Sequence, residues 1–354
     1  MIRIGISGIG VWGRNLLRNV VSNEETALVA VCDPDPAACR LAASLRHVKL
    51  CQQFNEMIED MGLDAVLVAS PPRLHYRQAR MAIEAGLDVL VEKPMCMTSE
   101  HAGALVALAR DRGRVLMVGH TFLYSNLVHE VKRRIDSGEL GEILYIYSQR
   151  LNLGRVRNDV DALWNLAPHD ISITAFLLDA WPHSASARGS SFIQKANAIA
   201  DVAFFQMDFD HDRIMSGHVS WLDPQKVRKM VVVGSRKMLV YDDIDSQRHV
   251  QIYDKSVAIE FQSGTQDFCD FRTRTRAGDL AVPQIGLIEP LGVEIAHFAE
   301  CVRDRLTPRT DGVHAVRVIA VMEAMSKSMK EGGMSVPIAY GDVTTVTTDA
   351  VCTP

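Results

Sequence analysis

The sequence lacks the features of a membrane or secreted protein. It has no run of about 18 apolar residues that could span a bilayer. The first residues lead into a strand pattern, without an apolar leader or a small-residue cleavage site. The seven cysteines contain no Cys-x-x-Cys pair, and their spacing is irregular. This pattern predicts reduced thiols rather than a disulfide framework, and we expect a cytoplasmic protein.

The chain also lacks a strong excess of either charge. It has 38 Lys and Arg against 43 Asp and Glu, a formal net charge of −5 over 354 residues, and no basic block. We therefore expect no binding to nucleic acid or to a membrane surface. Hydrophobic residues make up 47% of the chain, which is ample for a folded core and excludes a disordered protein. The length predicts about two domains.

Residues 1–121 alternate short apolar runs with helix patterns. The runs are nearly continuous in apolar character, which is typical of parallel strands covered on both faces. Strand–helix alternation over this length predicts a doubly wound parallel sheet in an α/β domain. The expected strands are 2–7, 27–32, 65–69, 88–91 and 115–118, and the expected helices are 14–23, 37–46, 74–85 and 101–112.

Residues 122–340 have a different pattern, with longer strands in which apolar and polar residues alternate. This alternation predicts a second domain whose sheet has one solvated or interface face. A hairpin should turn at Gly234-Ser235. The Thr-rich segment 341–354 is expected to be a loosely ordered tail. The expected strands are 143–150, 184–192, 201–209, 213–221, 229–233, 238–241, 250–253 and 257–261, and the expected helices are 127–137, 171–178, 291–302 and 313–323.

A glycine motif, Gly8-Ile9-Gly10-Val11-Trp12-Gly13, follows the first strand and opens the first helix. This context is the one that a dinucleotide-binding fingerprint requires. Gly8 allows a tight turn, Gly10 lets the backbone approach a pyrophosphate, and Gly13 lets helix and strand pack closely. The motif predicts a dinucleotide cofactor contacted by these glycines together with Val11 and Trp12. An ordinary glycine-rich turn is the alternative.

Asp33 lies twenty residues beyond Gly13, at the end of the second expected strand. An acidic residue in this position is typical of binding to the adenosine ribose hydroxyls, and it repels a 2′-phosphate. The following residues, Pro34-Asp35-Pro36, supply no arginine for such a phosphate. The sequence therefore favours NAD over NADP. A helix-capping or turn aspartate is the alternative.

The tripeptide Glu92-Lys93-Pro94 comes directly after the strand expected at 88–91. Lys93 should therefore lie at the carboxyl end of the sheet, where open α/β folds bind ligands. A lysine beside an oxidised nicotinamide would have a lowered pKa, and it could bond to a substrate hydroxyl or accept its proton. A surface lysine in a loop is the alternative.

A histidine in the second domain is the candidate acid or base. His169 follows Pro168, which suits a helix start, and we expect His169 in the first turn of that helix. A histidine in such a place is often structural. Together with a lysine at a cofactor site, it becomes a candidate general base.

These motifs together resemble the Gfo/Idh/MocA oxidoreductase family over roughly residues 1–338. The resemblance implies an N-terminal Rossmann domain and a C-terminal α/β domain with a large open, mostly antiparallel sheet. It also implies NAD or NADP as cofactor, and sugars or cyclitols as substrates. In this family the open sheet commonly forms contacts between subunits, so we expect a homodimer or homotetramer.

The resemblance also implies roles for single residues. Lys93 matches the lysine that contacts the reacting hydroxyl, and His169 matches the usual acid/base. Asn165 stands where inositol-dehydrogenase-like members have an aspartate, and an amide cannot relay a proton. Lys93 and His169 would then share the proton between them, unless Asp161 or Asp170 takes part.

Further positions match the surroundings of the cofactor. Ser70, Pro71 and His75 match the loop that lies along the cofactor after the third strand. Glu92 belongs to the same cofactor edge. His120 follows the strand expected at 115–118 and would line the cleft of this fold.

The stretch 149–158 supplies candidate substrate contacts. Arg150, Arg155 and Arg157 suit a phosphate, pyrophosphate or carboxylate, and Asn152 and Asn158 suit sugar hydroxyls. A solvated charged loop is the alternative. Read with 164–171, the stretch is similar to members that act on nucleotide-linked sugars, several of which oxidise the 3-hydroxyl. Free sugars, glycosides and inositols remain open as substrates, as does the reduction of a 3-ketosugar.

The predicted reaction is hydride transfer from a secondary carbinol carbon to the nicotinamide, with the proton taken by His169. No metal is required for it. A cofactor-binding sensor or regulator of the same fold is the non-enzymatic alternative. Both Lys93 and His169 are present, and no basic DNA-binding segment is added, which favours an enzyme.

Overall fold

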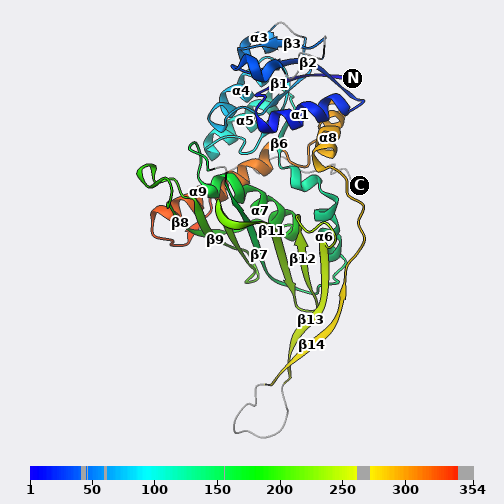
Figure 1. Cartoon of the computed structure of the whole chain (residues 1–354), viewed down its shortest axis with the longest axis vertical. Coiled ribbons are helices and arrows are strands. Elements are labelled where there is room, and N and C mark those ends of the chain that lie inside the picture. The colour runs from blue at the N-terminus through cyan, green and yellow to red at the C-terminus, as the bar shows by residue number, and fades with distance from the viewer. Residues whose placement is uncertain (41–44, 46, 60–61, 155, 261–271, 342–354) are drawn as a thin grey trace. The chain divides into compact units, whose positions relative to one another are not determined.

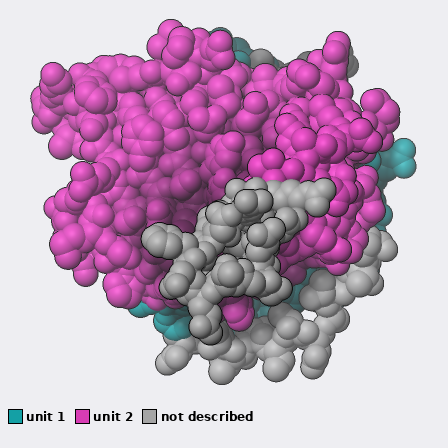
Figure 2. All heavy atoms as spheres, turned by 90° about the horizontal axis from the view of Figure 1, so that it is seen from below, with its two compact units in different colours: residues 1–125, 288–323, 339–354 teal, residues 126–287, 324–338 magenta. Residues whose placement is uncertain are grey.

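The computed structural model describes residues 1–40, 45, 47–59, 62–154, 156–260 and 272–341. The chain divides into two compact units, coloured in Figure 2. Unit 1 comprises residues 1–125, 288–323 and 339–354, and unit 2 comprises residues 126–287 and 324–338. The predicted tail, 341–354, lies outside the described residues except for Gly341.

Unit 1 contains a six-stranded parallel sheet, as predicted for a doubly wound fold (Figure 1). The strand order reverses at β1, so the edge beyond the carboxyl end of β1 is the topological switch point, where such sheets bind ligands. In sheet order, the strands are β3 (Lys49–Cys51), β2 (Thr26–Cys32), β1 (Ile2–Ser7), β4 (Ala65–Val68), β5 (Asp88–Glu92) and β6 (Leu116–Gly119). The short β3 was not predicted, because two of its three residues are exposed and it has no apolar run.

The helices between these strands begin within three residues of their expected positions. They are α1 (Val11–Ser22), α2 (Pro36–Cys39), α4 (Pro72–Glu84) and α5 (Ser99–Asp111), with α3 (Phe54–Glu59) and the 3₁₀ helix η2 (Thr121–Tyr124) in addition. The helix expected over 37–46 is seen as α2, and residues 41–44 and 46 of that range lie outside the described part of the chain. Asp35 caps α2 by accepting a hydrogen bond from the Ala37 N–H.

The helix α8 (Pro290–Asp304) belongs to unit 1, although it comes late in the chain. Its residues Leu291, Ile295, Phe298 and Val302 repeat at helical spacing, are buried, and join the core formed by β1 and α1. The sequence grouped this helix with residues 122–340 by chain order alone. Its apolar face instead packs into the same core as the parallel sheet, so contacts assign residues 288–323 to unit 1.

Unit 2 contains a nine-stranded sheet that is mostly antiparallel, as expected, with one parallel pair between β10 and β7. In sheet order, the strands are β14 (Arg272–Ala281), β13 (Val250–Glu260), β12 (Met238–Asp242), β11 (Leu222–Gly234), β7 (Ile143–Leu153), β10 (Ile214–Ser220), β9 (Val202–Asp208), β8 (Ser184–Ser190) and β15 (Val336–Pro337). The hairpin predicted at Gly234-Ser235 joins β11 to β12.

Four strand predictions were wrong in detail. Strand β11 begins at Leu222, seven residues before the expected start at 229. Strand β13 is continuous where two short strands were expected, and residue 261 of the second lies outside the described chain. Strand β7 continues three residues beyond the predicted end at residue 150. The long strand β14 was missed, because its sequence RTRTRAGDLA has no alternating apolar residues to signal it.

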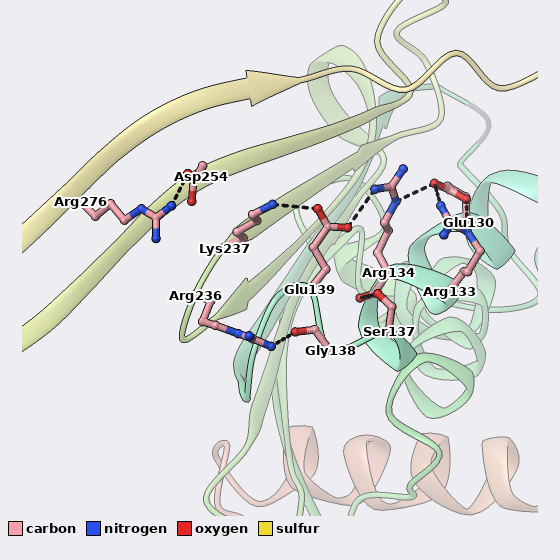
Figure 3. Close-up of polar contacts among 10 residues, drawn as sticks. All are labelled: Glu130, Arg133, Arg134, Ser137, Gly138, Glu139, Arg236, Lys237, Asp254 and Arg276. Atoms are coloured by element: carbon pink, nitrogen blue, oxygen red, sulfur yellow. Dashed lines mark hydrogen bonds and ion pairs between the residues drawn. The ribbon is translucent and has the colours of Figure 1, made fainter.

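A charged network joins the end of helix α6 (Asn126–Asp136) to the β11–β12 turn (Figure 3). The Glu139 carboxylate accepts from Arg134 Nη1 at 2.9 Å and from Lys237 Nζ at 2.9 Å. Arg134 also bonds to Glu130, and Arg236 donates to the Gly138 carbonyl. The two cations lower the pKa of Glu139, Arg134 most strongly. This network fixes the hairpin whose turn the sequence predicted.

Helices cover one face of the unit 2 sheet (Figure 1). Helix α7 (Ala162–Leu178) packs on β7, β9 and β10, and α6 packs on β12. Strand residues on the other face include exposed aromatic and apolar side chains, namely Tyr145, Tyr147, Phe204 and Ile214. The last long helix, α9 (Gly312–Lys330), begins in unit 1 and ends in unit 2. No helix among the described residues is long and apolar enough to cross a bilayer.

Candidate cofactor and catalytic sites

The glycine motif lies at the carboxyl end of β1, where its three glycines meet different surroundings. Gly8 has φ +90°, and a Cβ there would lie 2.6 Å from the Ala69 carbonyl group. A Cβ on Gly13 would lie 1.9 Å from the Gly8 carbonyl oxygen, so only glycine allows this close packing. A Cβ on Gly10 would meet no atom of the described part of the chain within 4 Å. The loop is thus closed at Gly8 and Gly13 and open at Gly10.

The N-terminus of α1 is suited to an anion. Gly10 is its N-cap residue, no side chain caps the helix, and its first turn contains no acidic residue. The N-terminal N–H groups and the positive end of the helix dipole therefore have no competing carboxylate of this helix. Together with the open space at Gly10, this arrangement fits the pyrophosphate of a dinucleotide.

Asp33, at the end of β2, holds the same loop. Its Oδ2 accepts from the Ile9 N–H at 2.7 Å, and its Oδ1 accepts from the Asp35 N–H at 2.9 Å. The second bond forms an Asx turn, so the turn role considered as an alternative is present. Asp33 is only half-buried, and carboxylate oxygens have further lone pairs for ribose hydroxyls. Ribose binding therefore stays a prediction that this geometry permits.

His75 connects two loops at this edge of the sheet. The ring is 1% exposed, with Nε2 2.7 Å from the Ser70 carbonyl oxygen and Nδ1 2.8 Å from the Pro94 carbonyl oxygen. Burial lowers the pKa of His75, and a neutral ring has only one N–H to donate to these two acceptors. His75 therefore connects the Ser70-Pro71 loop to Lys93-Pro94. Its contact with the cofactor stays a prediction.

Strand β5 ends at Glu92, Lys93 follows it directly, and the Lys93–Pro94 peptide bond is cis. The Trp12 indole Nε1 donates a hydrogen bond to Glu92 Oε1, which ties the glycine motif to this tripeptide. Burial raises the pKa of Glu92 to about 7, against the opposing effects of Lys93 and Trp12. Lys93 is half-buried at the carboxyl end of the sheet, as predicted from the strand before it.

His120 follows β6 and is almost completely buried within unit 1. Its ring meets that of His314 edge to face, with centroids 5.1 Å apart. Burial lowers the pKa of His120 well below its usual value, and His314 and Lys93 act in the same direction. Burial also lowers the pKa of His314, to about 4. The structure thus places His120 near Lys93 and His314 against His120, and the sequence identified only His120.

The position of His169 in its helix was predicted wrongly. Asp161 is the N-cap of α7 and accepts from the Trp164 N–H at 2.8 Å, so the helix begins at Ala162 and His169 is its eighth residue. Pro168 lies inside the helix, and the start signal that it suggested is overridden by the Asp161 cap. Asn165 and His169 are four residues apart, share one helix face, and are both half-buried.

Asp161 and Asp170, the two other acids considered for the proton, both have structural partners. Asp161 caps the helix, and burial raises its pKa. Asp170 receives two hydrogen bonds from Arg150, from Nε at 3.2 Å and from Nη2 at 3.0 Å. The Arg150 and Asp170 side chains are 8% and 4% exposed. This buried pair fixes α7, and with it His169, on strand β7.

The predicted arginine loop is therefore not a single loop. Arg150 and Asn152 lie within β7, and Arg150 is paired with Asp170. Arg157 lies beyond the strand and forms a more exposed pair with Asp159. Arg155 lies outside the described residues. The pairing of Arg150 could not be read from the sequence, because its partner is twenty residues away.

Sequence reasoning also missed a buried carboxyl group in unit 1. Glu294 of α8 is completely buried, and Thr121 Oγ1 donates to its Oε2 at 2.7 Å. Its spacing could have predicted the burial of Glu294. It stands three residues after Leu291 and four before Phe298, on the apolar face of the helix.

The Arg150–Asp170 pair generates a stability prediction. Arg150→Met should lower the free energy of unfolding by about 3–5 kcal/mol, because it leaves the Asp170 carboxylate buried without its cation. Arg157→Met, at the more exposed pair, should change it by less than about 1 kcal/mol. Denaturant unfolding of both variants measures this difference. Equal losses, or an Arg150 variant that is stable but fails only in substrate binding, would contradict the structural role of Arg150.

Two family models match this chain. The model described as an oxidoreductase family with an NAD-binding Rossmann fold, GFO_IDH_MocA, matches residues 2–120. The GFO/IDH/MocA C-terminal domain model matches residues 128–240. The matched ranges contain the glycine motif, Lys93 and His169.

Curated relatives align over nearly the whole chain. A scyllo-inositol 2-dehydrogenase (NAD(+)) of Bacillus subtilis is 26% identical over 345 residues, covering 94% of this chain and 95% of the relative. A UDP-N-acetylglucosamine 3-dehydrogenase of Acidithiobacillus ferrooxidans is 26% identical over 322 residues, covering 90% of this chain and 94% of the relative. The two relatives, which act on different substrates, are thus equally similar to this chain.

Solved structures agree with the fold. The structure of UDP-N-acetylglucosamine 3-dehydrogenase GnnA from Acidithiobacillus ferrooxidans superposes with a TM-score of 0.73 at 25% identity, covering 93% of this chain and 98% of that chain. GenD2 from gentamicin A biosynthesis, in complex with NAD, gives a TM-score of 0.80 at 21% identity, with 96% of each chain covered. With both family models matched in order along the chain, this protein belongs to the Gfo/Idh/MocA family of oxidoreductases.

Proposed function

We propose that this protein is an NAD-dependent sugar dehydrogenase that oxidises a secondary alcohol to a ketone. The observation that carries the proposal is the hydrogen bond from Trp12 to Glu92. It joins the glycine motif after β1 to the Glu92-Lys93-Pro94 tripeptide after β5, so both lie at the carboxyl edge of one parallel sheet. A dinucleotide site and a lysine suited to a hydroxyl group are thereby brought together within unit 1.

The cofactor in this proposal is NAD, which supplies the hydride acceptor. Gly8, Gly10 and Gly13 would hold the pyrophosphate, because the loop is open at Gly10 and α1 starts there. Asp33 would accept hydrogen bonds from the ribose hydroxyls, and its charge disfavours the 2′-phosphate of NADP. Both oxygens of Asp33 are already oriented by backbone N–H groups, which fixes the carboxylate for this purpose.

Lys93 and His169 have the proton-handling roles. The carbinol C–H bond breaks with its electron pair transferred as hydride, and the hydroxyl proton passes to His169. Lys93 bonds to the reacting oxygen and stabilises its developing negative charge. Asn165, one turn before His169 on the same helix face, orients the substrate or the imidazole and cannot take the proton itself.

The first candidate substrate is a nucleotide-linked hexose, oxidised at its 3-hydroxyl. The similarity to UDP-N-acetylglucosamine 3-dehydrogenase supports it. Because Arg150 is paired with Asp170, a phosphate clamp would rest on Arg155 and Arg157, with Asn152 for a hydroxyl. The second candidate is an inositol, which the equal similarity to the scyllo-inositol enzyme favours.

We propose that subunits associate through the uncovered face of the unit 2 sheet. Tyr145, Tyr147, Phe204 and Ile214 are each more than a third exposed on it, and such aromatic side chains are enriched at interfaces. Phe204→Asp should shift the protein to a smaller species in sedimentation, because it places a charge in this interface. A wild-type chain that sediments as a monomer would contradict the proposal.

The proposed activity is tested by cofactor reduction with NAD or NADP over a panel of nucleotide sugars, free sugars, glycosides and inositols. We expect turnover with NAD, and Lys93→Met should lower kcat by at least about 100-fold while NAD still binds. Lys327→Met, at an exposed lysine of α9, is the matched control and should keep full activity.

The panel distinguishes the alternatives. Turnover confined to nucleotide sugars supports the first candidate substrate, and turnover with inositols supports the second. Net reaction only in the direction of ketone reduction would make the protein a 3-ketosugar reductase. NAD binding without turnover of any substrate would favour a sensor and contradict the proposed enzyme.

A further inference from the structure

Unit 1 holds a buried acid that the proposed mechanism does not use. Glu294 of α8 is completely buried, and its Oε2 accepts from Thr121 Oγ1 at 2.7 Å. Its Oε1 is buried without a hydrogen-bond partner in the described structure. A carboxylate in such a place would lack the hydrogen bonds that normally accompany a buried charge, so the geometry disfavours an ionised Glu294.

A second buried carboxyl group, that of Glu92, acts on Glu294. Glu92 ends β5, is 7% exposed, and accepts from the Trp12 indole. Its carboxyl group lies against β6, where a Cβ on Gly119 would be 3.0 Å from Glu92 Oε2. Glu92 therefore has a hydrogen-bond donor and a neighbouring cation, Lys93, whereas Glu294 has only a hydroxyl group.

The groups that act on the two carboxyls come from every element around them. Glu92 faces Trp12 of α1 and Lys93, and Glu294 faces Thr121 and Tyr124 of η2 and Glu92 of β5. Burial, and then the Glu92 charge, raise the pKa of Glu294 well above its usual value. Among the described residues, Lys93 is the cation that acts on Glu92, and no cation there acts on Glu294.

We propose that Glu294 keeps its proton in the folded protein, so that Glu92, once ionised, carries the single negative charge beside Lys93. Two adjacent carboxylates repel each other, and one retains its proton when the other ionises. The consequence for catalysis rests on the proposed function. One carboxylate matches the charge of Lys93, whereas a second would add an uncompensated negative charge and weaken the stabilisation that Lys93 gives to the reacting oxygen.

The proposal is tested first without cofactor or substrate, by the pH dependence of folding. In the unfolded chain Glu294 ionises near pH 4.3, while the folded protein keeps the proton, so the wild type loses stability as pH rises above that value. Glu294→Gln cannot ionise in either state and still accepts from Thr121. The ratio of its folding equilibrium constant to that of the wild type should therefore increase by about tenfold per pH unit from pH 5 upward.

Glu323→Gln is the matched control. Glu323 also lies on a helix of unit 1, and it accepts from a hydroxyl group, Ser99 Oγ, at 2.5 Å and from the Ser99 N–H at 3.1 Å. Its stability difference from wild type should not grow with pH in this range. A constant difference for Glu294→Gln as well would show that Glu294 is ionised in the folded state and would overturn the proposal.

Infrared spectroscopy of the wild type provides a second test that does not depend on the variant folding. Above pH 8, where Glu92 is mostly ionised, the C=O stretch of a protonated carboxylic acid should persist in the wild type. The band should be lost in Glu294→Gln and kept in Glu323→Gln. A wild type without this band overturns the proposal. Neither this test nor the folding test uses NAD or a sugar, so their failure is separate from failure of the proposed dehydrogenase activity.

The catalytic consequence is measured last, once a substrate is known. Glu294→Gln should keep kcat/KM and its pH profile within about threefold of wild type, because a neutral side chain replaces a neutral acid. Glu92→Gln removes the single negative charge and should lower kcat/KM by about tenfold or more. An equal loss in both variants would contradict a protonated Glu294.

Discussion

The architecture of unit 1 depends on the close packing of Gly13 against the Gly8 carbonyl at the end of β1. Any side chain at position 13 would overlap that oxygen, so the first helix can start this close to the sheet only with glycine. The packing brings the N-terminus of α1 to the switch point of the parallel sheet. Asp33, Ser70 and Glu92 lie at the carboxyl ends of β2, β4 and β5, at the same edge. This one contact and the strand order give the arrangement that dinucleotide-binding sheets use.

Buried polar contacts hold the candidate site residues within each unit. In unit 1, Trp12 donates to Glu92, His75 bridges two loops through backbone carbonyls, and Thr121 donates to the buried Glu294 of α8. In unit 2, the buried Arg150–Asp170 pair fixes helix α7 on its sheet, next to His169. The chemistry-bearing residues are thus held by buried polar contacts, which are costly to leave half-made and therefore define positions sharply.

Local signals in the sequence predicted the parallel sheet, the glycine motif and the place of Lys93, because each rests on residues close together in the chain. The start of α7 was misread, since Pro168 suggested a helix start while the true cap, Asp161, lies seven residues earlier. The partner of Arg150, the packing of α8 into unit 1 and the strand β14 depend on contacts between distant residues or on a strand without apolar alternation. Such features are set by tertiary packing and not by local pattern.

The central claim is that the opening at Gly10 receives the pyrophosphate of NAD, and one measurement tests it directly. A Cβ at position 10 would meet no atom of the described residues within 4 Å, so we expect Gly10→Val to unfold at nearly the same temperature as the wild type. The same side chain would occupy the space assigned to the pyrophosphate, so calorimetric titration should show NAD affinity reduced by about 100-fold or more. A stable Gly10→Val variant that binds NAD as tightly as the wild type would contradict the account.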